Sequence, residues 1–122
     1  MPLYNFQKQF AAAVESGEKR QTIRAKRKNR PQVGQTAFLY TGARTKACRK
    51  LGEAEIVEVC PVLIGSKGLI INYGEDIGEC IENEPQDIDY FAREDGFKDW
   101  PEMRDWFLKT HGLPFEGDLI KW

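Results

Sequence analysis

The chain has 122 residues, of which 41% are hydrophobic and 30% charged. This length and composition are typical of one compact domain, here residues 1–122, that buries a core without metal or disulfide support. No stretch approaches the ~20 apolar residues of a membrane span, which argues against a membrane protein. The formal net charge is -1.

The charges are distributed unevenly along the chain. Residues 1–50 carry twelve Lys or Arg against two Glu, and residues 51–122 carry six against seventeen Asp or Glu. The first half therefore predicts a face that binds polyanions and the second half an acidic face. The alternative is that the two halves neutralise each other in the folded chain.

The first half of the chain predicts one helix and two strands. Asn5 is a good N-cap, apolar residues then recur at helical spacing over residues 6–16, and Gly17 ends the helix. A bend and a short strand follow within residues 18–24, and a second strand covers residues 36–40. The segments 25–32 and 41–52 are basic and predict exposed loops.

The second half predicts further strands and then helices. Residues 53–64 give the longest β signal, broken at Pro61, and glycines bound another strand over residues 68–74. The remaining elements are a helix that ends at Gly96, a helix with a capping box from Asp99 to Glu102, and a closing strand over residues 117–122. These elements predict an α+β fold of five or six strands and about three helices, in which the sheet curls into a barrel.

The cysteines and the single histidine indicate no metal site. Cys48, Cys60 and Cys80 are widely spaced without a CxxC pair, which favours a reducing cytoplasmic environment. His111 follows the last predicted helix, where a cation meets the negative end of the helix dipole, so a structural role is favoured over catalysis. We expect no metal and no cofactor.

Three segments resemble a known family. They are "GEKRQTIR" (17–24), "VGQTAFLYTGARTKACRKLGEAEI" (33–56) and "AREDGFKDWPEMRDWF" (92–107). Together with the closing strand they are similar to the ASCH domain family, which is related to the PUA domains of RNA-modifying proteins. The most specific elements are G-x-K-x-x-T-I-R and D-G-F-x(4)-E-M. The resemblance implies a small PUA-like β-barrel with peripheral helices, a basic cleft, and a role in RNA or nucleotide chemistry.

The resemblance also implies candidate catalytic residues. Some ASCH proteins are amidohydrolases that deacetylate modified cytidine, and others are described as ribonucleases. Their lysine, threonine and carboxylate correspond here to Lys19, Thr22 and Asp95, with Glu94 as an alternative carboxylate. The chain departs from the family by a longer basic loop after Arg24. A lysine of lowered pKa can take the proton of a threonine hydroxyl, and a carboxylate can orient that lysine.

A non-catalytic RNA-binding module is the alternative function. Its phosphate contacts would come from basic residues of the first half, chiefly Arg20, Arg24, Arg27, Arg44, Lys46 and Arg49, helped by Lys26, Lys28 and Arg30. A third possibility, a protein-interaction domain, predicts an exposed apolar patch. In each case we expect a monomer or a weak dimer.

The burial of Lys19, Thr22 and the carboxylate distinguishes the hydrolase from the RNA-binding module. A hydrolase must enclose its catalytic groups in a pocket, whereas a binding surface need not. Asp95 stands where a helix ends, an unfavourable place for an anion without a partner, so we predict that Asp95, rather than Glu94, lies close enough to Lys19 or Arg24 for a charge-assisted hydrogen bond. We also predict that Thr22, Arg24, Arg44 and Arg49 line one positive cleft. The structural alternative is that Lys19 is an exposed loop residue and Thr22 an ordinary strand residue.

Overall fold

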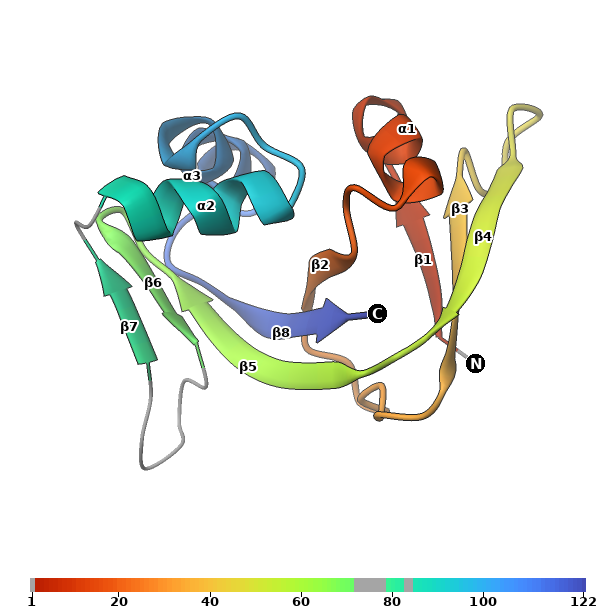
Figure 1. Ribbon diagram of the computed structural model, residues 1–122, viewed down its shortest axis with the longest axis horizontal. Coiled ribbons are helices and arrows are strands. Elements are labelled where there is room, and N and C mark those ends of the chain that lie inside the picture. Colours follow the sequence, from red (N-terminus) through yellow and green to blue (C-terminus); the bar gives the residue numbers. More distant parts are fainter. Residues whose placement is uncertain (1, 72–78, 83–84) are drawn as a thin grey trace.

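The computed structural model describes residues 2–71, 79–82 and 85–122, which form eight strands and three helices in an α+β arrangement (Figure 1). The strands are β1 (Leu3–Phe6), β2 (Gln21–Ala25), β3 (Thr36–Thr41), β4 (Arg49–Glu55), β5 (Glu58–Ile64), β6 (Gly68–Ile71), β7 (Glu79–Glu82) and β8 (Phe115–Lys121). The helices are α1 (Lys8–Ser16), α2 (Pro85–Glu94) and α3 (Trp100–Thr110). None of these helices is long and apolar enough to cross a bilayer.

The strands form two sheets. One has the order β1-β3-β4, with β1 parallel to β3, and the other has the antiparallel order β2-β8-β5-β6-β7. β4 and β5 follow one another as a single bent ribbon that passes from the first sheet to the second (Figure 1). At this bend the Ile56 N–H donates to the Gln35 carbonyl and the Val57 N–H donates to the Lys121 carbonyl. The described strands thus curl into two joined sheets rather than a closed barrel, so the α+β class is confirmed and the barrel is not.

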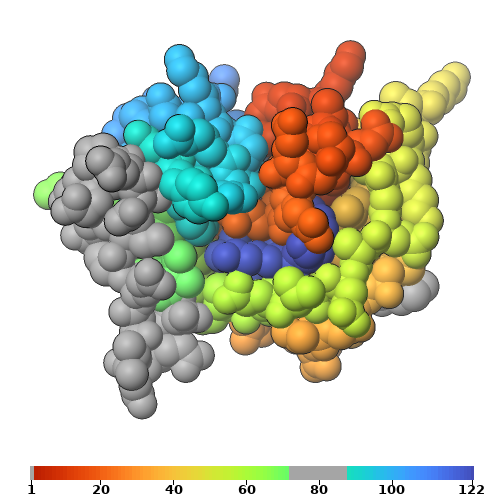
Figure 2. All heavy atoms as spheres, viewed as in Figure 1, coloured from red at the N-terminus to blue at the C-terminus, as the bar shows by residue number. Residues whose placement is uncertain are grey.

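One hydrophobic core fills the space between the sheets and the helices. The period-2 pattern of β1 places Tyr4 and Phe6 inside, and α1 buries Phe10, Ala11 and Val14 on one face. The helices lie on one side of the two joined sheets (Figure 1). In Figure 2 the atoms of α1 and α2 lie above those of β5. Polar groups carried by the ends of these helices are thereby brought close to β2.

Several predicted boundaries are corrected by the structure. Asn5 does not cap α1: it lies in β1, an unpredicted strand, and Gln7 is the N-cap. The predicted basic loop 41–52 contains the start of β4, and Pro61 does not interrupt β5, because it pairs with Asp118 of β8 at a point before the β6 ladder begins.

Other boundaries agree with the sequence. Gly17 ends α1 in the left-handed conformation, and Asp99 caps α3 by accepting a hydrogen bond from the Glu102 N–H. The predicted strand 68–74 is β6 as far as Ile71, and its last three residues lie outside the described part. β7 had no counterpart in the sequence prediction.

Candidate functional site

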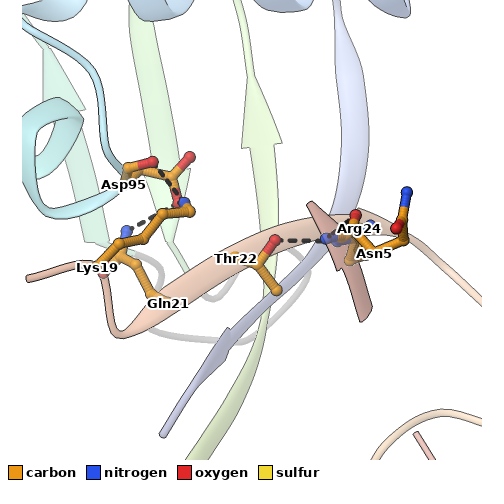
Figure 3. Close-up of polar contacts among 6 residues, drawn as sticks. All are labelled: Asn5, Lys19, Gln21, Thr22, Arg24 and Asp95. Atoms are coloured by element: carbon orange, nitrogen blue, oxygen red, sulfur yellow. Dashed lines mark hydrogen bonds and ion pairs between the residues drawn. The ribbon is translucent and has the colours of Figure 1, made fainter. Parts of the chain in front are cut away.

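A cavity of about 280 Å³ opens where β2 passes under α1 and the two C-terminal helices. Its polar wall contains Lys19, Thr22, Arg24 and Asp95 (Figure 3). The remaining lining residues are Asn5, Phe6, Gln7, Phe10, Ile23, Ala25, Phe97, Trp106, Phe107, Thr110 and His111. Residues from both halves of the sequence therefore line one cavity, which is partly open to solvent.

Lys19 and Asp95 form a buried ion pair in this cavity. The Lys19 ammonium lies 3.2 Å from Asp95 Oδ1 and also donates to the Asp95 backbone carbonyl. Each residue is only 3% exposed. The rings of Phe6 and Phe10 lie 5.9 and 5.3 Å from the same ammonium. Lys19 is therefore neither an exposed loop residue nor a surface charge.

The local backbone explains how the two groups meet. Lys19 stands in the bend between α1 and β2, where its N–H donates to the Ala13 carbonyl. Asp95 directly follows α2, and Gly96 turns the chain there with a φ of 94°. Gln21, which the sequence analysis missed, donates from Nε2 to Asp95 Oδ1 over 3.3 Å, and Figure 3 shows these three side chains pointing toward one another.

The prediction that Asp95 rather than Glu94 approaches Lys19 is confirmed. Glu94 does not line the cavity. Its carboxylate lies instead beside the exposed Tyr90, where it raises the pKa of the phenol. Asp95 is consequently the candidate carboxylate of the site.

Burial shifts both members of the pair toward their neutral forms. Loss of hydration lowers the pKa of Lys19, against the opposing effect of Asp95, and the nearby Arg24 charge lowers it further. Loss of hydration likewise raises the pKa of Asp95, although Lys19 and Gln21 favour its ionised form. A neutral amine, the form that can accept a proton, is therefore easier to reach here than at the surface.

Thr22 and Arg24 share one face of β2, as strand alternation predicts. Arg24 Nε donates to Thr22 Oγ1 over 2.9 Å, and its Nη2 donates to the Asn5 carbonyl over 3.0 Å. The guanidinium also packs 5.4 Å from the Tyr4 ring and 4.9 Å from the Phe6 ring. Burial, reinforced by Arg27, lowers the pKa of Arg24 to about 10. Arg24 is thus a fixed part of the cavity wall.

The other predicted phosphate contacts lie outside this cavity. Arg44 and Lys46 are exposed in the loop between β3 and β4, and Arg49 begins β4. Thr22 and Arg24 line the cavity but Arg44 and Arg49 do not, so these four residues do not share one cleft as predicted. Arg20 donates to the Trp122 carbonyl, and Arg27 packs on the Tyr4 ring. Acidic partners hold Arg49 and two further cations, in the pairs Arg49–Glu15, Lys26–Glu116 and Arg30–Asp118.

An aromatic wall faces the polar one. Phe10 packs edge-to-face against Phe97 and Trp106, with centroids 5.2 and 6.0 Å apart, and the Trp106 indole N–H donates to Gln7 Oε1. Trp106 lies on the apolar face of α3, yet it is only partly buried and lines the cavity. The helical spacing identifies the apolar face of α3. It cannot show that part of this face borders a cavity.

His111 occupies the C-terminal cap of α3, as the sequence predicted. Its ring stacks on Phe115 at a centroid distance of 4.6 Å and also borders the cavity. It lies on the aromatic side of the cavity, where it can contact a ligand. Its place at the end of a helix had favoured a structural role alone.

Comparisons of the chain with protein-family models, with curated proteins and with solved structures gave no match. The resemblance to the ASCH domain family therefore stays a prediction.

Proposed function

We propose that this protein is a small amidohydrolase that removes an acyl group from the exocyclic amine of a cytidine-type nucleoside. The observation that carries the proposal is the burial of Lys19, Thr22 and Asp95 in the wall of one cavity. This is the enclosure that hydrolysis requires and that a binding surface does without. The ASCH resemblance supports the same activity, a PUA-like description of the curled sheets, and a cytoplasmic location.

The size of the cavity suits a single base with its acyl group. Its volume of about 280 Å³ is close to the lower limit of ~300 Å³ for small-molecule sites. The aromatic wall of Phe10, Phe97 and Trp106 offers surfaces against which a flat base can pack. An RNA strand would not fit, so only one base would enter the cavity.

Thr22 is the proposed nucleophile. Because Thr22 Oγ1 accepts a hydrogen bond from Arg24, its own hydrogen is free to point to a base, and the adjacent cation favours loss of that proton. The Thr22 oxygen attacks the acyl carbon while the neutral Lys19 amine takes the hydroxyl proton. The C–N bond then breaks, and the Lys19 ammonium returns the proton to the departing nitrogen.

Water completes the cycle. Lys19 takes a proton from a water molecule that attacks the acyl–threonine ester, and the C–O bond to Thr22 breaks as the threonine regains its proton. The products are a carboxylic acid and the free nucleoside. Asp95 orients the Lys19 amine throughout and stabilises its charged form.

The test is acetate release from N4-acetylcytidine by the purified protein. Lys19→Ala, Thr22→Val and Asp95→Asn should each reduce kcat by about 100-fold or more, with circular dichroism spectra unchanged. Glu94→Gln is the matched control and should retain activity. The absence of acetate release by the native protein, or equal losses in Asp95→Asn and Glu94→Gln, would contradict the proposal.

A non-catalytic RNA-binding module is the second candidate. It is favoured by the exposed cations Lys28, Arg44 and Lys46, which have no ion pair within the described residues. For such a module, Asp95→Asn should leave RNA affinity equal or higher, because the substitution removes a negative charge.

A further inference from the structure

A second cavity of about 610 Å³ adjoins the first. Asn5, Phe6 and Gln7 line both of them, so the end of β1 forms a wall that the two spaces share. α1 forms one wall of the second cavity, and the opposite wall is formed by the segment that leads from β3 to β4 (Figure 1). A ligand bound beside Thr22 would reach this space by passing over the exposed Gln7 side chain.

The walls of the second cavity leave room for a ligand and are held in place. α1 contributes Ala11 and Ala12, and the facing loop contributes Gly42 and Ala47, all of them small residues. Asn5 Oδ1 fixes this loop by accepting a hydrogen bond from the Ala43 N–H at 2.8 Å.

The loop is also stabilised from within. Thr45 Oγ1 donates to the Gly42 carbonyl over 2.6 Å and accepts from the Ala47 N–H over 3.1 Å. Little ordering is therefore required when a ligand binds.

Positive charge surrounds this space. Lys8 and Arg49 line it, and Arg44 and Lys46 are exposed on its loop. Arg49 is paired with Glu15 at 2.5 Å, whereas the other three cations have no ion pair in the part of the chain that the structure describes. The positive end of the α1 dipole adds to the same field, since no acidic residue lies in its first turn. The cavity is thus complementary to an anion.

We propose that the second cavity binds a phosphate ester of the substrate, so that the protein acts on a nucleotide in preference to a free nucleoside. The inference rests on the proposed function for the placement of the base. The base occupies the first cavity, the ribose passes Asn5 and Gln7, and the phosphate lies near Lys8 in the first turn of α1. A mononucleotide and an RNA chain both supply such a group.

Product binding tests this inference without hydrolysis. Calorimetry should show that cytidine 5′- or 3′-monophosphate binds at least about tenfold more tightly than cytidine, the gain expected from one charge-assisted contact. Lys8→Ala should remove that advantage and leave cytidine affinity unchanged, whereas Arg49→Gln should reduce the advantage less, because Arg49 is already paired with Glu15. Lys28→Ala, which removes an equally exposed cation from another loop, should keep the advantage.

Equal affinities for cytidine and both monophosphates would overturn the inference, as would equal losses in Lys8→Ala and Lys28→Ala. A short RNA that ends in cytidine distinguishes the two sources, because it binds more tightly than the mononucleotides only if further phosphates are contacted.

The proposed function and this inference can fail separately. Hydrolysis of acetylcytidine with the same kcat/KM as its monophosphates would retain the first and reject the second. A phosphate preference without any hydrolysis would do the reverse.

Discussion

At the scale of the residue, Lys19 places an ammonium where only 3% of its surface meets solvent. Such a charge is costly unless it is paired, and Asp95 supplies both a carboxylate and a backbone carbonyl. The pair alone would hold the lysine protonated, which does not suit a base. Burial and Arg24 act in the opposite direction and lower the pKa of Lys19. Asp95 thus stabilises the charged form of Lys19, while burial and Arg24 make its neutral, basic form easier to reach.

This balance predicts the pH dependence of hydrolysis. The neutral amine is the active form, so kcat/KM should rise with pH, with a midpoint below the unperturbed lysine pKa of 10.5. Arg24→Gln removes a like charge that lowers the pKa of Lys19, so the profile should move to higher pH. Rate–pH profiles of the two proteins measure the shift, and a move to lower pH would contradict the role of Lys19 as the base.

The cysteines give a second prediction at this scale. Cys60 is buried, and burial raises the pKa of its thiol to about 11, whereas Cys48 is exposed. Only thiolates react readily with alkylating agents. Iodoacetamide at pH 8 should therefore modify Cys48 in the native protein, and Cys60 should react only in denaturant. Peptide mass spectrometry measures both, and equal rates in the native state would show that β5 opens readily.

At the scale of the element, the turn after α2 sets the position of Asp95. Gly96 has a φ of 94°, and a Cβ atom there would lie 3.0 Å from Lys19 Cδ and 3.1 Å from Phe10 Cδ1. The same residue thus permits the turn and the close approach of α2 to the Lys19 side chain. Elements from opposite ends of the chain meet at this point.

Gly96→Ala should consequently be more damaging than an ordinary glycine substitution. Gly34 offers a matched control, because its φ of 95° is nearly equal and nothing lies within 4 Å of its Cβ position. Gly34→Ala should lower the free energy of unfolding by about 1 kcal/mol from backbone strain alone. Gly96→Ala should lower it further and reduce hydrolysis. Urea denaturation and acetate release measure these effects, and equal costs would show that the contact with Lys19 is unimportant.

How much of the fold could be predicted depended on how local each signal was. The α3 cap at Asp99 and the αL residue Gly17 were predictable because each is specified within a few positions. β1 was not, because a four-residue strand is stabilised by its parallel partner β3, over thirty residues away. Asn5 therefore resembled a helix cap.

The candidate site was predictable in part for the same reason. Lys19 and Thr22 belong to one motif, and the resemblance supplied Asp95. Gln21 carried no signal, because its role depends on a carboxylate 74 positions away. Trp106 gave the pattern of an ordinary core residue, and only the packing around it shows that it borders a cavity.

At the scale of the whole molecule, the basic and acidic halves of the sequence interleave. Lys26 pairs with Glu116 at 2.9 Å, and Arg30 pairs with the buried Asp118 at 2.7 Å. Part of the positive charge of residues 1–50 is therefore neutralised by the second half, as the alternative interpretation of the sequence expected. The positive field is left mainly around cations without such partners, including Arg44 and Lys46 on the loop between β3 and β4.

This distribution predicts how RNA affinity depends on salt. Contacts between cations and phosphates release counterions, so the affinity for a short single-stranded RNA should fall as salt rises, with a log–log slope of about 0.7 per contact. Replacing Arg44 and Lys46 by Gln should reduce the slope by about 1.4. Replacing Lys26 and Lys50 by Gln is the matched control, since Glu116 and Glu53 already pair with these lysines.

The control should change the slope much less, because ion-paired cations have little free charge to offer a phosphate. Fluorescence anisotropy over a range of salt concentrations measures all three proteins. An affinity that does not respond to salt would show that RNA, if bound at all, is not held through its phosphates. Equal slopes for the two double variants would show that the loop between β3 and β4 does not contact the strand, and the phosphate contacts would then have to lie elsewhere on the basic surface.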